Sequence, residues 1–111
     1  MAATAAHDKK GEEILVLDVG SIMGIVDHFV VTSASNTRQV RTIVDEVEQQ
    51  LRERADLKPR ATEGLTDASW VLIDYGDVVV HVFLTETREF YGLERLWADA
   101  PRVTWEGARA S

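Results

Sequence analysis

The stretch of sequence that decides the fold is WVLIDYGDVVVHVFLTETREFYGLERLW, residues 70–97. It opens with two apolar runs, residues 70–73 and residues 78–84, which the turn-like sequence DYGD separates. Gly76 in this turn can adopt the positive φ that a tight hairpin requires. The pattern therefore predicts two antiparallel strands. Because apolar residues occupy both faces of the second strand, that strand is predicted to lie at the centre of a sheet.

A short amphipathic helix is predicted after the hairpin. Phe90, Leu93 and Trp97 fall at i, i+3 and i+7, so they form one apolar stripe, which we expect to be mainly buried. Thr85 is in position to cap the first turn of this helix. Beyond it, residues 103–105 have the composition of a last edge strand.

The sequence ahead of the hairpin predicts two strands and a short edge strand. Apolar runs at residues 14–19 and 29–32 are typical of strands, and the first is continuous enough to predict cover on both faces. Residues 57–64 contain Pro59, which cannot donate to a sheet ladder. This segment is therefore predicted to be a short strand at an edge.

The longest predicted helix lies between these strands. Apolar residues recur at i, i+3, i+4, i+7 and i+11 from Val40 to Leu51, and charged residues occupy the opposite side. Asn36, followed three residues later by Gln39, resembles a capping box, in which each side chain bonds a free backbone N–H. The helix is therefore predicted to begin just after Asn36 and to bury one stripe.

Together these elements predict an α/β (α+β) fold, a mixed β-sheet with helices packed on it. The chain is predicted to be a single domain over residues 1–111, with flexible tails at 1–11 and 106–111. The first segment could instead form a loose helix. The long helix would cover one sheet face. The short C-terminal helix, the N-terminal segment or a second subunit must cover the other, because a bare apolar sheet would be sticky.

Composition excludes several classes of protein. The chain contains no Cys, which rules out disulfides, thiolate metal sites and cysteine nucleophiles and fits a reducing cytoplasm. No apolar stretch approaches the roughly 20 residues of a membrane span, so no membrane partner is expected. A net charge of −7 disfavours direct nucleic-acid binding and favours a basic protein partner.

No catalytic or metal-binding group of residues stands out, and no cofactor is expected. The three His share no metal-ligand spacing, and His81 is interpreted as a packed, hydrogen-bonded histidine in preference to a catalytic one. Asp74 and Asp77 are interpreted as turn residues in preference to a paired-carboxylate site. A Gly-Ser pair ahead of Asp27 resembles the nucleotidyltransferase pattern, but the second metal-binding carboxylate does not follow.

Aromatic residues are concentrated in residues 70–97, where they serve either a core or a docking surface. Trp70 and Trp97, at the ends of elements, are interpreted as core in preference to interface. Tyr75 is different, because at a turn tip beside Gly76 it is expected to be substantially exposed. An exposed aromatic residue on a rigid turn favours the role of an anchor for a protein partner.

Two segments of the chain closely resemble the ribosomal silencing factor family, also called the Iojap-like family. They are DHFVVTSASNTRQVRTIVDEVEQQL, residues 27–51, and residues 63–64 with 70–97, in which DYGD, VVVHVF and REFYGLERLW occur in that order. The resemblance covers most of the chain, from about residue 12 to about residue 100. It implies a mixed α/β fold of the nucleotidyltransferase-like superfamily without the catalytic carboxylates, and therefore a protein that is not an enzyme.

The resemblance also implies a function. Family members bind the large ribosomal subunit through its protein number fourteen and block joining of the small subunit when nutrients are short, and many are homodimers. For this chain the expectation is a cytoplasmic translational repressor that forms a homodimer and has no direct nucleic-acid specificity. A ribosome-assembly module, or a nucleotide-binding module of nucleotidyltransferase ancestry, stays open as an alternative. The partner-facing surface carried over by position consists of Trp70, Asp74, Tyr75, His81, Tyr91, Leu93 and Trp97.

Overall fold

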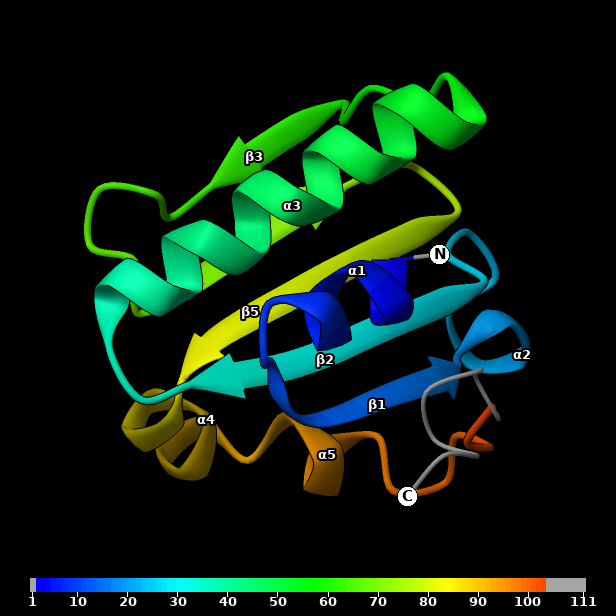
Figure 1. Ribbon diagram of the computed structural model, residues 1–111. Helices are drawn as coiled ribbons and strands as arrows, with labels where there is room; N and C mark the ends of the chain where they lie inside the picture. The colour runs from blue at the N-terminus through cyan, green and yellow to red at the C-terminus, as the bar shows by residue number, and fades with distance from the viewer. Residues whose placement is uncertain (1, 104–111) are drawn as a thin grey trace.

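The computed structural model describes residues 2–103, which form one mixed sheet with helices packed on it (Figure 1). The strands are β1 (Glu12–Asp18), β2 (His28–Ala34), β3 (Ala61–Glu63), β4 (Trp70–Asp74) and β5 (Val78–Leu84). The helices are α1 (Ala2–Asp8), α2 (Gly20–Met23), α3 (Thr37–Ala55), α4 (Thr85–Tyr91) and α5 (Leu93–Leu96). The strand order is β1-β2-β5-β4-β3, with β2 and β5 parallel and the other neighbours antiparallel. The predicted α+β fold is confirmed.

The β4–β5 hairpin forms as predicted, and β5 is the central strand of the sheet. In the turn, Gly76 adopts a φ of 93°, and its N–H donates to Asp74 Oδ1 at 2.7 Å. The N–H of Tyr75 donates to the carbonyl of Val78 at 2.9 Å. Asp74 is therefore a turn residue whose side chain bonds the neighbouring backbone, as the sequence predicts.

Strand β1 lies at an edge of the sheet, and the predicted cover on both faces is confirmed only in part. Ile14 and Val16 pack partly buried against the core on one face, and Leu15 and Leu17 pack against the core on the other. In this strand only Leu17 is buried, so a continuous apolar run here marks a half-buried edge strand and not a central one. Its outer edge is partly paired, since Leu17 bridges Arg102 and the N–H of Val103 donates to the Val16 carbonyl at 2.7 Å. Residues 104–105 of the predicted last strand lie outside the described residues. The predicted edge position of β3 is confirmed.

The start of α3 is capped, although not by a complete capping box. Asn36 Oδ1 accepts from the N–H of Gln39 at 2.8 Å, as predicted. The reciprocal bond is not formed, because the Gln39 side chain donates to the carbonyl of Lys9, just after α1. One stripe of α3 is buried as predicted, and no helix within residues 2–103 is long and apolar enough to cross a membrane.

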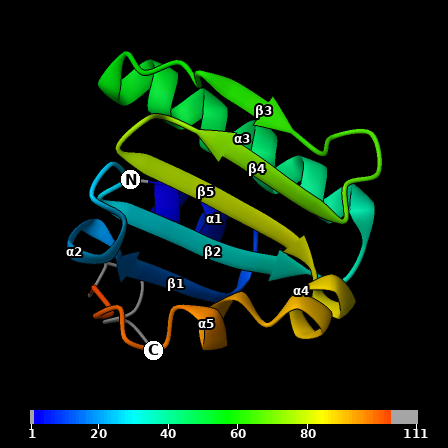
Figure 2. The ribbon, with the colours of Figure 1, turned by 180° about the vertical axis from the view of Figure 1, so that it is seen from behind.

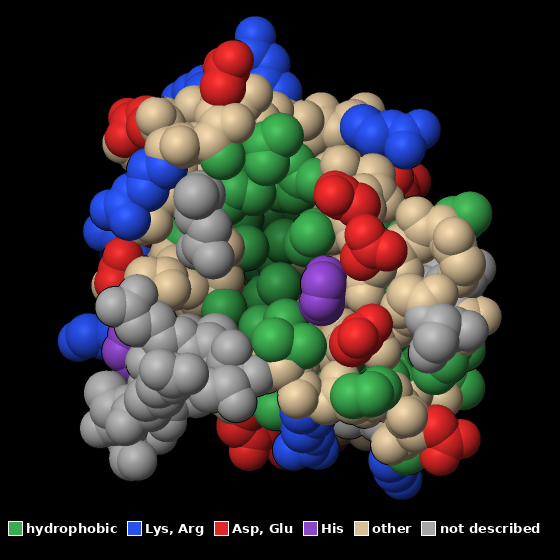
Figure 3. Space-filling view, turned by 90° about the vertical axis from the view of Figure 1, so that its right-hand side faces the viewer, with side chains coloured by type: hydrophobic (Ala, Val, Ile, Leu, Met, Phe, Trp, Pro, Cys, Tyr) green, Lys and Arg blue, Asp and Glu red, His purple; other side chains and the backbone are tan. Residues whose placement is uncertain are grey.

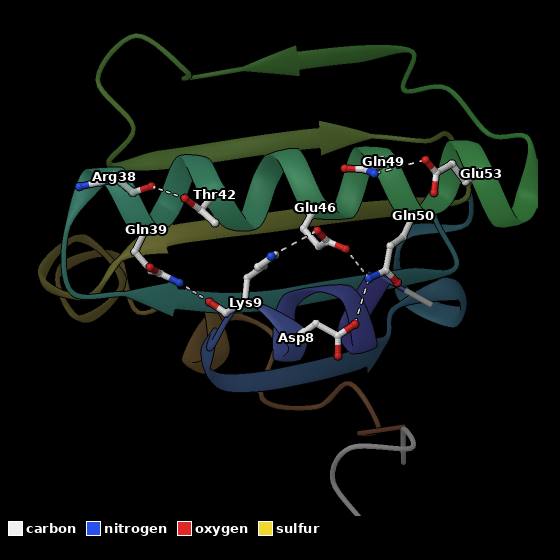
Figure 4. A network of polar contacts seen from close by, with 9 residues as sticks. All are labelled: Asp8, Lys9, Arg38, Gln39, Thr42, Glu46, Gln49, Gln50 and Glu53. Atoms are coloured by element: carbon white, nitrogen blue, oxygen red, sulfur yellow. Dashed lines mark hydrogen bonds and ion pairs between the residues drawn. The ribbon is translucent and has the colours of Figure 1, made fainter.

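The first segment of the chain forms a helix, α1, which is the predicted alternative to a flexible tail. Its four buried alanines belong to the core beneath α3. Polar contacts join the two helices (Figure 4). Lys9 Nζ, just after α1, lies 3.8 Å from Glu46 Oε1, and Gln50 Nε2 donates to Asp8 Oδ2 at 3.0 Å. Within α3, Gln50 Nε2 also donates to Glu46 Oε2 at 2.6 Å. A helix this short is marginal alone in water, so these contacts and the buried alanines hold it on α3. The predicted tail at 106–111 lies outside the described residues.

The two faces of the sheet are covered differently. Helices α1 and α3 lie on one face, and on the other face α4, α5 and the chain up to Ala100 run beside β1 and β2 (Figure 2). Within residues 2–103 no helix lies over β4 on this second face. The C-terminal segment therefore supplies part of the cover that the sequence requires. The core on this face consists of Leu17, Val19, Val26, Phe29, Val31, Val79, Phe83, Leu93 and Ala100.

The single helix predicted after the hairpin is two helices. Gly92 has a φ of 59°, in the left-handed region, where it ends α4 and precedes α5. Because the break rotates one half of the apolar stripe away from the other, Leu93 is buried whereas Phe90 is 80% exposed. The prediction of Phe90 as core is wrong. Thr85 is not the cap but the first residue of α4, and its Oγ1 donates to a carbonyl at the end of β2 at 3.0 Å.

Candidate partner-binding surface

Aromatic rings gather on the sheet face opposite α3. We call this group the aromatic cluster, and it consists of Phe29, Trp70, His81, Phe83, Tyr91 and Trp97. Trp70 is paired with Phe83 across the hairpin, which brings their ring centroids to 4.9 Å, and it lies 5.0 Å from Tyr91. Phe29 of β2 joins this group to Trp97 at 5.4 Å. The hairpin, β2 and the C-terminal segment thus build one continuous aromatic surface.

The aromatic cluster is buried at its centre and exposed at its rim. Phe83 is fully buried, Trp70 and Trp97 are half-buried, and Tyr91 is 57% exposed. Phe90 extends the exposed rim along α4, and a shallow pocket of about 450 Å³ is lined by Trp70, Tyr91 and residues of α4. Partly exposed aromatic rings on a buried, rigid base are typical of surfaces that bind protein partners.

His81 is buried within the aromatic cluster, where it contacts Trp70. Its side chain is 4% exposed, and its Nδ1 accepts a hydrogen bond from Trp70 Nε1–H at 3.2 Å. Burial lowers the pKa of His81 to about 4, so the ring is neutral near pH 7 and, with Nδ1 accepting, carries its proton on Nε2. Nε2 has no hydrogen-bond partner in the described part of the chain. The interpretation of His81 as a packed, hydrogen-bonded histidine is confirmed, and its bond orients the Trp70 ring.

Tyr75 contradicts its predicted exposure. Its side chain is 9% exposed and belongs to the core beneath α3, together with Val71 and Ile73. These residues alternate along the strand, and alternation carries all of them to the α3 face. Burial first, and the charge of Glu48 second, raise the pKa of Tyr75 to about 12. The Tyr75 hydroxyl has no hydrogen-bond partner in the described part of the chain.

The structure gathers most of the residues that the resemblance assigns to the partner. On the face of the aromatic cluster lie Trp70, His81, Tyr91, Leu93 and Trp97, with Leu93 buried. Asp74 is half-buried in the turn, and Tyr75 faces the other way. Sequence reasoning missed Phe90 as a surface residue. The signal that could have found it was Gly92, because a glycine after a helical stripe commonly ends the helix.

A second concave surface opens at the end of the sheet where β2 and β5 begin (Figure 3). Hydrophobic side chains form its floor, and its volume is about 490 Å³. Tyr75 lines this hollow, so its ring contributes to a different surface from Trp70. We call it the apolar hollow, and its lining includes Val16, Val30, Leu51, Leu57, Tyr75 and Val78, with His28 and Asp77 as polar neighbours.

Asp27 does lie near one further carboxylate, which comes from the end of β1. A Cβ placed on Gly20 would be 3.4 Å from Asp27 Oδ1 and 3.5 Å from Asp18 Oδ1. Asp18 Oδ1 already accepts from the Gly20 N–H at 3.2 Å. Within the described residues no group of three or more His, Cys, Asp or Glu could hold a metal ion. The two carboxylates therefore lack a third ligand there.

Known proteins resemble this chain over most of its length. The family model described as "Ribosomal silencing factor during starvation" matches residues 1–111. The ribosomal silencing factor of Bacillus subtilis strain 168 is 43% identical over 101 residues, which are 91% of this chain and 85% of that protein. A mouse protein named "Mitochondrial assembly of ribosomal large subunit protein 1" is 32% identical over 100 residues, which are 87% of this chain and 43% of that protein.

The fold is also found in a solved structure. A crystal structure of a Chromobacterium violaceum protein matches with a TM-score of 0.84 and 36% identity, over 88% of this chain and 81% of that chain. The expected relation to the nucleotidyltransferase-like superfamily stays a prediction. Since the family model spans all 111 residues and the B. subtilis relative aligns over most of both proteins, this chain belongs to the ribosomal silencing factor family.

Proposed function

We propose that this protein binds the large ribosomal subunit and represses translation by preventing the small subunit from joining when nutrients are short. Membership of the ribosomal silencing factor family is the observation that carries the proposal. The name of the mouse relative refers to the large subunit, which favours that subunit as the partner. Blocking a surface requires neither catalysis nor a cofactor, so the protein acts without being an enzyme.

The aromatic cluster is the surface that we propose meets the ribosome, through protein number fourteen of the large subunit. Trp70 and Tyr91 offer partly exposed rings above the buried ring of Phe83, which is the arrangement of a binding hot spot. A stable interface needs only about 800 Å² from each partner. The net charge of −7 suits a basic ribosomal protein, because complementary charge speeds association.

Sedimentation of purified ribosomal subunits tests this proposal. Excess protein is expected to co-sediment with large subunits and to lower the amount of joined ribosomes. A Trp70→Ala, Tyr91→Ala double variant is expected to lose both effects. Leu65→Ala is the matched control, because Leu65 is 41% exposed and its carbonyl accepts from Arg41 of α3, away from the aromatic cluster. Undiminished subunit joining at excess wild-type protein would overturn the proposal.

An assembly role is the second candidate, and the word "assembly" in the name of the mouse relative favours it. Co-sedimentation with immature large subunits alone, and none with mature ones, would support assembly over silencing. A nucleotide-binding module is the remaining alternative. Tight binding of a magnesium nucleotide in calorimetry, lost in Asp27→Ala, would support it.

The proposal includes a homodimer in the cytoplasm, in keeping with the resemblance. The exposed apolar side chains of Ile25 and Leu57 are surfaces that a second copy could cover. Light scattering over a range of protein concentrations measures the mass. A mass that stays at the 12.4 kDa of one chain would contradict the homodimer.

A further inference from the structure

Three arginines spaced seven residues apart in the sequence converge on one pocket. Arg88 comes from α4, Arg95 from α5, and Arg102 from the segment that bridges β1. The pocket has a volume of about 620 Å³ and lies between these segments and β1. In the sequence the arginines are scattered among carboxylates, so only the fold gathers them.

Arg88 lines the base of this pocket, where hydrogen bonds hold its side chain in place. Its side chain is 5% exposed, and it donates to the Glu12 carbonyl at 3.2 Å, the Glu13 carbonyl at 2.8 Å and Ser33 Oγ at 3.0 Å. Between Glu12 and Leu15 the register of β1 shifts, and Glu13 adopts a φ of 45°. Arg88 therefore holds the irregular start of β1 in place and keeps the pocket wall rigid.

Arg95 and Arg102 are the two guanidinium groups that remain for a ligand. Both side chains are exposed, and neither makes a side-chain hydrogen bond or ion pair among the described residues. Glu13 and Glu89 also line the pocket, but no ion pair within 4.0 Å joins them to these arginines in residues 2–103. Two exposed guanidinium groups beside a rigid wall are suited to an anion with several oxygens.

Gly92 allows Arg95 to fold back toward the pocket. A Cβ at this position would lie 2.5 Å from Arg95 Nη2 and 2.8 Å from Nε. Any side chain at residue 92 would therefore displace the guanidinium. The same glycine ends α4, so the break in the helix and the position of the arginine depend on one residue.

The pocket lies next to the aromatic cluster. Helix α4 carries Tyr91 on the aromatic side, while Arg88 and Glu89 line the arginine pocket. A ligand of Arg95 and Arg102 would therefore sit at the edge of the surface proposed to meet a ribosomal protein. On a ribosome, the anion most abundant beside a protein is the phosphate of the RNA backbone.

We propose that Arg95 and Arg102 bind backbone phosphates of ribosomal RNA at the edge of the aromatic docking surface. This inference rests on the proposed function. Phosphate contacts position a protein without reading base sequence, so they agree with the expected absence of nucleic-acid specificity. The net charge of −7 repels RNA overall, and the two arginines would provide a local contact with RNA in spite of it.

The salt dependence of binding to large subunits tests the inference. Affinities of the wild-type protein and of an Arg95→Gln, Arg102→Gln double variant are measured by fluorescence anisotropy between about 50 and 200 mM KCl. The variant is expected to bind roughly tenfold more weakly at low salt. The slope of log affinity against log salt is negative, and its magnitude is expected to fall by about 1.5, for two lost phosphate contacts. Circular dichroism checks that the variant is folded.

The matched control is Arg52→Gln, Arg54→Gln, which removes the same charge from two exposed arginines in the last turn of α3. Its slope is expected to stay close to that of the wild type. An equal fall in the control, or an unchanged slope in Arg95→Gln, Arg102→Gln with binding retained, would overturn the phosphate site. Absence of any binding by the wild-type protein would instead overturn the proposed function.

A separate titration distinguishes RNA phosphate from free phosphate. Inorganic phosphate is titrated into the wild-type protein in a calorimeter, and only weak or undetectable heats are expected. Saturable binding at micromolar phosphate that the double variant loses, combined with an unchanged salt slope on subunits, would assign the site to a free anion. That result would overturn the RNA contact.

Discussion

Trp70 and Tyr75 are aromatic residues five positions apart in one strand and turn, and they serve opposite faces of the sheet. Tyr75 packs beneath α3, where the cover is complete enough to leave it 9% exposed. Trp70 lies on the face that no described helix covers over β4, and it is half-buried among other rings. Because alternation along a strand decides which face a side chain lies on, an odd spacing places Tyr75 in the core beneath α3 and Trp70 in the aromatic cluster on the other face.

The largest effect that would test this comparison is the loss of stability in Tyr75→Ala. Removing a buried aromatic side chain is expected to lower the free energy of unfolding by about 3 kcal/mol, measured by urea denaturation. The folded variant should still bind large subunits better than Trp70→Ala does. A Tyr75→Ala protein with wild-type stability and no binding would restore Tyr75 as the exposed anchor that the sequence predicts.

Acid is expected to lower the stability of the folded protein through His81. Its pKa is lowered from 6.5 to about 4 in the folded protein, so below pH 6.5 the unfolded chain binds a proton that the folded chain does not. The stability associated with neutral His81 is complete above pH 6.5 and is lost as the pH falls toward 4, by on the order of 3 kcal/mol. Urea denaturation of wild type and His81→Phe at pH 7 and at about pH 4 measures the difference. An equal loss of stability in both proteins would contradict the lowered pKa of His81.

Trp70→Ala is expected to act on binding more than on folding. Loss of a hot-spot ring should weaken affinity for large subunits by about 2 kcal/mol, or roughly thirtyfold. Trp70→Phe is the informative control, because it keeps a ring against Phe83 but removes the N–H that His81 accepts. Its affinity should lie between those of the wild type and Trp70→Ala. Wild-type affinity in Trp70→Ala would remove the hairpin from the docking surface.

The smallest expected effect comes from Tyr75→Phe. This change removes a buried hydroxyl that has no hydrogen-bond partner in the described residues and leaves the ring in place. The free energy of unfolding should stay equal or rise by up to about 1 kcal/mol, since no buried polar group is left unpaired. A clear loss of stability in urea denaturation would mean that the hydroxyl does have a partner.

Local patterns in the sequence were enough to predict the hairpin, the central position of β5 and the start of α3 at Asn36. Each depends on residues close together in the chain, such as Gly76 in its turn. The position of β1 within the sheet was harder to predict. An apolar run like that of β1 does not reveal whether a second strand will pair with its outer edge.

The candidate site was predictable only in part, for a related reason. The resemblance supplied the residues, and two of them, Trp70 and Tyr91, lie side by side in the structure. The exposure of the residues could not be predicted in the same way. The predicted apolar stripe of Phe90 and Leu93 assumes one unbroken helix, but Gly92 ends the helix between them, which leaves Phe90 exposed and Leu93 buried. The convergence of Arg95 and Arg102 has no local signal at all, since it depends on how α5 and the end of the chain return to β1.

The parallel pairing of β2 with β5 has a consequence for how the protein is made. Phe29 pairs with Val79, and Arg88 bonds the carbonyl of Glu12, so contacts of long sequence separation close the sheet. Such contacts form slowly and only after both partners have been synthesised. The rings of the aromatic cluster come from β2 and the C-terminal segment as well as from the hairpin. A chain synthesised only as far as β5 therefore lacks part of the aromatic cluster, and the surface proposed to meet the ribosome is complete only once Trp97 has been added.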